Sequence, residues 1–413
     1  MKDVNISGFR EKKNILSYAQ VAKVLIGINR EKIKKVRENK MAKIILNKDR
    51  FLEVISEIES IENIKIFREK IQQITDSLET KNDSLYLLNI VGNGDTINYK
   101  KELLLSDLKQ IIESLTLERA KYYLARLKKG IEEVKTSKIN DINLNRWKEY
   151  EDLTTDSLWY WKNRDSSGVH IASYWGNFIP QIPNQTLRRY TKKGDWVLDT
   201  FSGSGTTMIE CKRLGRNGVG IELNPRVVRE SKELISKEEN PSNVFTDVVE
   251  GDSRFISNES LLKHNPTKKF QMIIMHPPYH DIIRFSENKE DLSNAKNLKE
   301  FLDMFGKVVE NISPLLENNR YLILVIGDKY SKGEWIPLGH LTMLEVLKKG
   351  YTLKSTIVKN IEKTLGKRNQ EDLWRYRALV GGFYIFKHEY IFIFKKTGNK
   401  ERLIEEVINL KEQ

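Results

Sequence analysis

WVLDTFSGSGTT (196–207) is the stretch that decides the fold of this chain. Its first residues are apolar and strand-like, and the sequence after Thr206 has the pattern of a helix. Between them, Gly203 and Gly205 lie two positions apart, where a backbone without Cβ atoms can pass close beneath a ligand. The stretch therefore predicts a strand, a ligand-binding loop and a helix in succession.

Outward from this stretch, the same rhythm of apolar strand and helical segment continues toward the C-terminus. Such alternation is typical of an α/β fold with a doubly wound, mainly parallel sheet. In these sheets ligands bind beyond the carboxyl ends of the strands, so we expect the chemistry just after each strand. The further predicted strands are VGIEL (219–223), VFTDVVEGD (244–252), QMIIMHPPY (271–279), YLILVIGD (321–328), YTLKSTIVK (351–359) and YIFIFKK (390–396).

Acidic residues at the ends of the next two strands indicate a nucleotide ligand. Glu222 lies 19 residues after Gly203, at a spacing where a carboxylate accepts both hydroxyls of a ribose. Asp252 ends the third strand and is expected to accept a hydrogen bond from an adenine amine. The loop has no lysine of the phosphate-binding type. One acidic residue at such a place is usually a helix cap, but three in series, counting Asp199, predict a ligand site.

The fourth strand ends in His276-Pro277-Pro278-Tyr279. Two prolines fix an extended, rigid turn and leave the preceding carbonyls without a competing N–H. The Tyr279 ring offers a flat face for stacking. Together these groups suit a planar amine, whose hydrogens are accepted while the ring holds the base. A rigid turn around a buried tyrosine is the purely structural alternative.

DTFSGSGTT, the two acidic strand ends and HPPY together resemble the amino-methyltransferases of DNA, whose signature is Asp/Asn/Ser-Pro-Pro-Tyr. The resemblance covers residues 155–396. It implies a sheet of seven strands that binds S-adenosylmethionine (SAM), with residues 390–396 as an antiparallel seventh strand and residues 171–191 closing over the methionine moiety. No metal is expected. The implied cofactor-binding residues are Asp199, Phe201, Gly203, Gly205, Thr206, Glu222 and Asp252, and the implied catalytic residues are His276, Pro277, Pro278 and Tyr279.

His276 stands where the resembling family usually has Asp, Asn or Ser. A neutral imidazole accepts a hydrogen bond from an amine and an imidazolium does not, so we expect activity to fall below a pKa of about 6.5. The implied reaction is a direct displacement at the SAM methyl group after the base is flipped onto Tyr279. Adenine N6 is favoured only because adenine-modifying members are the larger share of the family. Cys211 lies in the helix after the glycine loop, which argues against ring-carbon methylation of cytosine.

Charge separates the two ends of the chain. Of a net charge of +13, residues 1–50 carry +9, which favours contact with a polyanion. Residues 1–150 are predicted to form a mostly helical basic domain for DNA or target recognition. It contains a candidate helix-turn-helix at 17–39 and a strand, turn and strand over 85–91 and 97–105. Residues 151–413 are predicted to form the methyltransferase domain.

Other features concern compartment and partners. No apolar run approaches the length of a membrane span, the N-terminus has no signal-type stretch, and a single cysteine excludes a disulfide framework. These features favour the cytoplasm. Double-stranded DNA is the expected substrate, and a restriction nuclease is a candidate partner. The open alternatives are a cytosine-N4 DNA methyltransferase, an RNA amino-methyltransferase and a catalytically degenerate DNA-binding protein.

Overall fold

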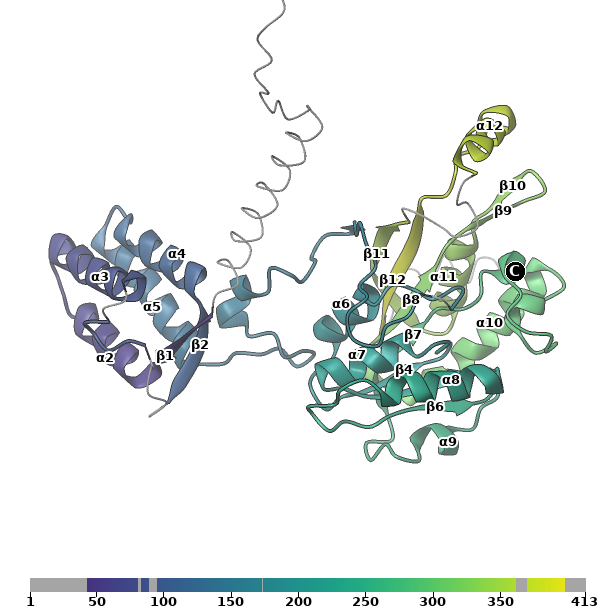
Figure 1. The fold of residues 1–413 in the computed structure, drawn as a ribbon, viewed down its shortest axis with the longest axis horizontal. Coiled ribbons are helices and arrows are strands. Elements are labelled where there is room, and N and C mark those ends of the chain that lie inside the picture. The colour runs from purple at the N-terminus through teal and green to yellow at the C-terminus, as the bar shows by residue number, and fades with distance from the viewer. Residues whose placement is uncertain (1–42, 81–82, 89–94, 173, 362–369, 398–413) are drawn as a thin grey trace, which may run out of the picture. The chain divides into compact units, whose positions relative to one another are not determined.

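A computed structural model describes residues 43–80, 83–88, 95–172, 174–361 and 370–397 (Figure 1). The chain divides into two compact units, one of residues 1–135 with 143–149 and one of residues 136–142 with 150–413. Each unit has a hydrophobic core of its own and is described by itself. The candidate helix-turn-helix at 17–39 lies outside the described residues.

The first unit is mostly helical in its described residues, as the sequence predicts. The predicted strand over 97–105 is wrong beyond Lys100, because a helix begins at Lys101 and buries Leu104, Leu108 and Ile111 at helical spacing. The remaining strand pairs with β1, and of the described residues 85–88 only Leu88 makes an isolated bridge, to Leu46. The elements are β1 (Lys43–Asn47), α2 (Lys48–Glu59), α3 (Ile64–Glu79), β2 (Thr96–Lys100), α4 (Lys101–Ile112), α5 (Leu117–Glu132) and η1 (Leu144–Glu149).

The second unit alternates strands and helices and contains every strand predicted after residue 195. Its elements are β3 (Leu158–Trp159), α6 (Gln181–Tyr190), β4 (Trp196–Asp199), α7 (Thr206–Leu214), β5 (Asn217–Glu222), α8 (Pro225–Ser236), β6 (Thr246–Glu250), α9 (Asn258–Leu262), β7 (Phe270–Met275), η2 (His280–Ile282), η3 (Leu292–Asn294), α10 (Leu298–Ile312), η4 (Ser313–Leu315), β8 (Leu316–Ile326), β9 (Lys329–Ser331), β10 (Glu334–Ile336), α11 (Leu338–Lys348), β11 (Tyr351–Asn360), α12 (Glu371–Gly381) and β12 (His388–Lys396).

The main sheet of the second unit has the strand order β3-β11-β12-β8-β7-β4-β5-β6. Strands β4 to β8 run parallel, and β12 runs antiparallel between β8 and β11. These observations confirm the doubly wound, mainly parallel fold and its antiparallel strand near the C-terminus. The sheet has eight strands and not the predicted seven, because the two residues of β3 add to the outer edge of β11.

Helices cover both faces of this sheet (Figure 1). Side chains alternate between the faces along each strand, since successive Cβ atoms of a strand point to opposite sides. Leu198 and Ile273 pack in the core that contains α10 and α11, whereas Val197 and Met272 pack in the core that contains α6, α7 and α8. No helix in the described part of the chain is both long and apolar enough to cross a bilayer.

One edge of the sheet collects the residues that matter for function. Strands β4 to β8 and β11 all end at this edge, because they run parallel to one another. The antiparallel β12 begins there, so Glu389, its second residue, lies opposite Lys359 near the end of β11. At this edge Glu389 also meets Tyr279, which follows β7 and precedes Glu389 by 110 residues.

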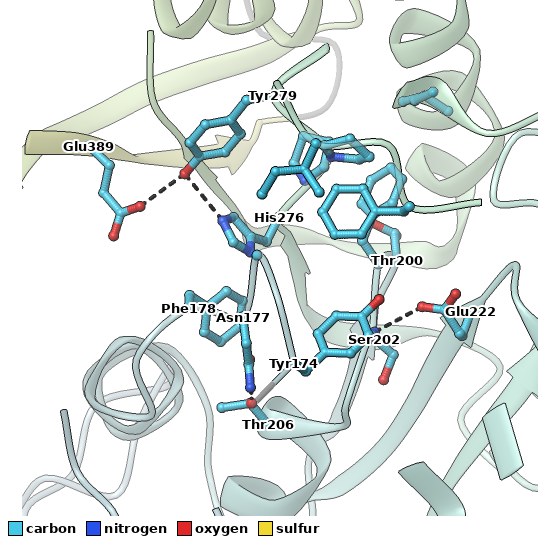
Figure 2. A pocket seen from close by; sticks show the side chains of 18 of the residues that line it. Tyr174, Asn177, Phe178, Thr200, Ser202, Thr206, Glu222, His276, Tyr279 and Glu389 are labelled. Carbon is cyan, nitrogen blue, oxygen red and sulfur yellow. Dashed lines mark hydrogen bonds between the residues drawn. The ribbon is translucent and has the colours of Figure 1, made fainter. Parts of the chain in front are cut away.

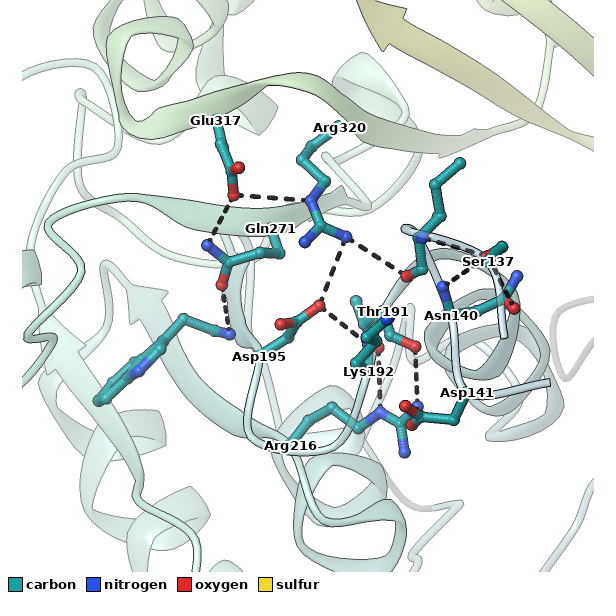
Figure 3. Close-up of polar contacts among 12 residues, drawn as sticks. Ser137, Asn140, Asp141, Thr191, Lys192, Asp195, Arg216, Gln271, Glu317 and Arg320 are labelled. Atoms are coloured by element: carbon teal, nitrogen blue, oxygen red, sulfur yellow. Dashed lines mark hydrogen bonds and ion pairs between the residues drawn. The ribbon is translucent and has the colours of Figure 1, made fainter. Parts of the chain in front are cut away.

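A polar network anchors residues 136–142 to the second unit (Figure 3). The buried Arg216 guanidinium donates to Asp141 Oδ2 at 2.8 Å, and Arg320 Nη1 donates to the Ile139 carbonyl at 3.3 Å. Asn140 Nδ2 donates to the Arg189 carbonyl at 2.8 Å. The observed division therefore differs from a single boundary at residue 150, since this segment belongs to the second unit.

Candidate active site

A cavity of about 650 Å³ opens at the carboxyl edge of the sheet, entirely within the second unit. Its volume is in the range of cofactor-binding pockets. We call one part the glycine-loop side; it is formed by Thr200, Phe201, Ser202, Gly203, Thr206, Glu222 and Asp252. We call the other part the catalytic-turn side; it is formed by His276, Pro277, Pro278, Tyr279, Lys359 and Glu389.

The glycine-loop side is held by backbone groups (Figure 2). Gly203 has φ +50°, and a Cβ there would lie 2.9 Å from the Tyr174 ring, so glycine is required both for the backbone and for the space. Its N–H donates to Glu222 Oε2 at 3.0 Å, and the Asn224 N–H donates to Glu222 Oε1 at 2.9 Å. Burial raises the pKa of the Glu222 carboxyl, although these two hydrogen bonds oppose the rise.

Two hydroxyls on this side fit a polar ligand. In the described part of the chain, Thr200 Oγ1 and Ser202 Oγ are buried and have no hydrogen-bond partner. Both residues line the cavity beside Glu222. A buried hydroxyl without a partner costs about 1–3 kcal/mol, which a bound ligand with matching donors or acceptors would recover. These two hydroxyls, together with the Glu222 carboxylate, which retains free lone pairs, fit the ribose and the other polar groups of SAM.

Two predicted cofactor residues do not line the cavity. Asp199 is buried, and its carboxylate accepts from Thr207 Oγ1 at 2.5 Å and from the Phe201 N–H at 3.0 Å. Burial raises its pKa to about 6 despite these hydrogen bonds. Gly205, at φ +81°, precedes α7 and would clash with Ile235 if it carried a Cβ. Both residues therefore determine the conformation of the glycine loop without lining the cavity.

Asp252 lines the cavity, but its carboxylate is already engaged. Arg254 binds both carboxylate oxygens through Nε at 3.1 Å and through Nη2 at 2.6 Å. The same guanidinium also pairs with Glu290. An adenine amine would have to share this carboxylate with Arg254, so the predicted role of Asp252 needs the oxygens' remaining lone pairs.

The segment 171–191 contacts the glycine loop. Thr206 Oγ1 donates to Asn177 Oδ1 at 2.7 Å, and Asn177 Nδ2 donates to Ser204 Oγ at 2.8 Å. The Tyr174 ring packs over Gly203, and the Phe178 ring lies 5.0 Å from the His276 ring. This segment therefore borders both sides of the cavity (Figure 2).

The catalytic turn follows a fully buried strand. Pro277 is buried, and the half-buried Tyr279 lies against Gly327, where a Cβ would approach its ring to 2.9 Å. Just beyond the turn, His280 adopts φ +54°, in the left-handed region that few residues other than glycine enter. Its Nε2 lies 3.1 Å from the Ala295 carbonyl, and its Nδ1 lies 3.1 Å from Lys329 Nζ. These two contacts hold the backbone that follows Tyr279.

A chain of hydrogen bonds runs through the catalytic-turn side (Figure 2). Tyr279 Oη lies 3.2 Å from His276 Nε2 and donates to Glu389 Oε2 at 2.9 Å. Lys359 Nζ pairs with Glu389 Oε1 at 2.8 Å. Burial lowers the pKa of His276 to about 4, so its imidazole is neutral near pH 7. Burial opposes ionisation of Glu389, but the Lys359 ammonium, the His276 imidazole and the hydrogen bonds from Lys359 and Tyr279 together outweigh it and lower the pKa of the carboxyl.

The structure thus brings together nine of the eleven predicted site residues and adds others. All four residues of the catalytic turn and five of the seven predicted cofactor residues line the cavity. Lys359 and Glu389 were not predicted. Their one signal in the sequence is their position: Lys359 is the last residue of YTLKSTIVK, and Glu389 directly precedes YIFIFKK. Only the strand register shows that these charges meet.

A cavity that joins a glycine loop to a turn suited to a planar amine belongs, in this fold, to the class of SAM-dependent methyltransferases. The sequence profile of the DNA methylase family, of the N6- and N4-methyltransferase type, matches residues 28–233 and 270–413. The chain belongs to this family. A profile described as conserved hypothetical protein 95 also matches residues 185–322.

Several type II methyltransferases are similar to parts of this chain. M.MjaII of Methanocaldococcus jannaschii is 43% identical over 58 residues, which are 14% of this chain and 11% of that protein. M2.DpnII of Streptococcus pneumoniae is 33% identical over 99 residues, 23% of this chain and 34% of that protein. The matched segments thus span no more than about a third of either relative.

Among solved structures, TrmN from Thermus thermophilus aligns with a TM-score of 0.35 and 17% identity, over 53% of this chain and 49% of that chain. A methyltransferase from Pyrococcus furiosus aligns with a TM-score of 0.35 and 14% identity, over 55% of this chain and 88% of that chain.

Proposed function

We propose that this chain transfers a methyl group from SAM to an exocyclic amine of a base in double-stranded DNA, with adenine N6 as the favoured target. The observation that carries the proposal is the single cavity in which Glu222 and the glycine loop face the His276–Tyr279 turn. Family membership and the partial likeness to type II methyltransferases support the DNA substrate.

The chemistry needs positioning and hydrogen-bond acceptors. When bound, SAM supplies an electrophilic methyl group. Exocyclic amines are weak nucleophiles because their lone pair is delocalised into the ring. Acceptance of the amine hydrogens by His276 and by the Pro277 carbonyl would localise that lone pair on nitrogen. The nitrogen would then take the methyl group in an in-line displacement: the new N–C bond would replace the C–S bond, the electron pair of that bond would stay on sulfur, and one amine proton would pass to water.

The base reaches the cavity only outside the duplex stack, so we propose that it is flipped out. Tyr279 then supports the base through its ring, which Gly327 and the bond to Glu389 hold in place. We expect the protein to act in the cytoplasm, where its DNA lies. A restriction nuclease with the same target sequence would be its partner, and cleavage of unmodified DNA by extracts of the source cells would test that pairing.

Direct product analysis tests the function. The full chain is incubated with SAM carrying a labelled methyl group and with duplex DNA or structured RNA, and the nucleosides are separated by mass spectrometry. We expect labelled N6-methyladenine from DNA. N4-methylcytosine would identify the alternative base, label in RNA alone would refute the DNA substrate, and no label with intact SAM binding would indicate a degenerate enzyme.

We also propose that residues 1–150 supply DNA affinity, since residues 1–50 carry a net charge of +9. Removal of residues 1–42 should weaken DNA binding and flatten its salt dependence, because each lost phosphate contact lowers the slope by about 0.9. Residues 136–142 stay in place in this variant, so the Arg216–Asp141 contact is kept. Unchanged affinity and slope would assign the segment another purpose.

A further inference from the structure

Four side chains on the catalytic-turn side form one hydrogen-bonded chain that ends on a fixed charge. Lys359 Nζ binds Glu389 Oε1 at 2.8 Å, and Glu389 Oε2 accepts from Tyr279 Oη at 2.9 Å. Tyr279 Oη in turn lies 3.2 Å from His276 Nε2. Lys359 and Glu389 are 6% and 7% exposed, so water does not compete for these contacts.

The direction of each hydrogen bond in this chain follows from the groups at its ends. An ammonium only donates and a carboxylate only accepts. The Glu389 carboxylate therefore takes the single proton of the Tyr279 hydroxyl. The Tyr279 oxygen is then left as an acceptor, and His276 Nε2 must carry the hydrogen that it receives.

A neutral imidazole holds one ring hydrogen, so this arrangement leaves His276 Nδ1 with a free lone pair. Within the described residues Nδ1 makes no hydrogen bond, and His276 lines the cavity. The opposite tautomer, with its hydrogen on Nδ1, would present a donor to the hydrogens of an amine and repel them. The tautomer thus decides whether the imidazole accepts from the target.

We propose that Glu389, held by Lys359, is a positioning residue that fixes His276 in the Nε2–H tautomer through the Tyr279 hydroxyl. This inference rests on the proposed function, because the free Nδ1 serves as an acceptor only if an amine is the target. It explains why a Lys–Glu pair is buried where β11 ends and β12 begins. A buried ion pair is seldom more stabilising than an apolar pair of similar volume, so its placement needs another reason.

The substitution Glu389→Gln tests the proposal by reversing the chain. Lys359 keeps the amide oxygen as its acceptor, which turns the amide N–H₂ toward Tyr279. The Tyr279 oxygen then accepts from the amide, its hydroxyl donates to His276 Nε2, and the imidazole hydrogen moves to Nδ1. We expect kcat to fall by about 100-fold, as for loss of a catalytic acceptor, with the KM for SAM unchanged.

A double variant separates this role from a purely structural one. Tyr279→Phe removes the link, so neither tautomer is imposed on His276 and part of the activity remains. Tyr279→Phe combined with Glu389→Gln should therefore be more active than Glu389→Gln alone. A double variant no better than Glu389→Gln would overturn the proposal. Glu310→Gln, in the exposed Lys349–Glu310 pair at 2.9 Å, is the matched control and should behave as wild type.

Nitrogen-15 NMR of the six histidines reads the tautomer of the unaltered protein directly. We expect the hydrogen of His276 on Nε2 in wild type and on Nδ1 in Glu389→Gln. His280 is an internal reference: Lys329 donates to its Nδ1 and its Nε2 faces the Ala295 carbonyl, so its hydrogen should be on Nε2 in both. A wild-type signal from Nδ1–H at His276 refutes the inference. Failure of DNA methylation with the expected tautomers would instead refute the proposed function alone.

Discussion

The two sides of the cavity are built from contacts of different range. On the glycine-loop side, Glu222 bonds to Gly203, 19 residues before it, and to Asn224, two residues after it. On the catalytic-turn side, Tyr279 bonds to Glu389, 110 residues after it. Backbone amides hold Glu222 on the first side, whereas a side chain from a distant strand holds Tyr279 on the second. The structural effect of removing one side chain should therefore stay local on the glycine-loop side. On the catalytic-turn side it should extend to residues of other strands.

The largest effect is expected for His276→Ala, which removes the acceptor at the centre of the catalytic-turn side. Because the imidazole is proposed to accept from the amine and lies on the catalytic-turn side of the cavity, kcat should fall by about 100-fold. SAM affinity, measured by calorimetry, should stay within about twofold of wild type. A wild-type kcat would leave catalysis to the Pro277 carbonyl and Tyr279, and a large loss of SAM affinity would show that the two sides are not independent.

A smaller effect is expected for Glu222→Ala on the glycine-loop side. The variant removes the acceptor of the Gly203 and Asn224 N–H groups and the proposed acceptor of the ribose hydroxyls, so SAM binding should weaken by about 1–3 kcal/mol. At saturating SAM, kcat should be nearly unchanged. Glu250→Ala is the matched control, since Glu250 is the exposed register partner of Glu222 on β6. Equal SAM affinity in both variants would exclude the ribose role.

Tyr279→Phe should have a milder effect than either. The ring remains for stacking, while the loss of the hydroxyl releases His276 from Glu389, so we expect kcat to fall by only about 3- to 10-fold, or roughly 1 kcal/mol. Tyr279→Ala should in addition raise the KM for DNA, because stacking on an aromatic ring contributes about 1–3 kcal/mol per base. Identical behaviour of the two variants would mean that the ring does not support the base.

The smallest effect is expected when the pH is changed and the rate is measured. Burial lowers the pKa of His276 to about 4, so the acceptor form exists above that value and is lost only as pH falls through it. The rate at saturating substrates should therefore change less than about twofold between pH 6 and 8. An acid limb centred near pH 6.5, as the unperturbed residue would give, would show that His276 is open to water in the working enzyme.

The different sequence range of these contacts also explains which residues of the site could be predicted from the sequence. Gly203, Glu222 and the HPPY turn lie at strand ends in consecutive units, so their common location follows from the rhythm of the chain. Whether a carboxylate is available to a ligand does not follow: Asp199 is buried and binds Thr207, and Asp252 lines the cavity but binds Arg254. The pairing of Lys359 with Glu389 depends on the register of an antiparallel strand inserted out of sequence order.

The anchoring of residues 136–142 has a consequence for synthesis on the ribosome. Residues 143–149 belong to the first unit, which is complete soon after they emerge. The seven residues before them have to wait for partners in the second unit, and Arg320 follows Ile139 by 181 residues. At about 5–20 residues per second, this delay is roughly 10 to 40 seconds. During it, a nascent first unit can fold while residues 136–142 still lack the last of their partners in the second unit.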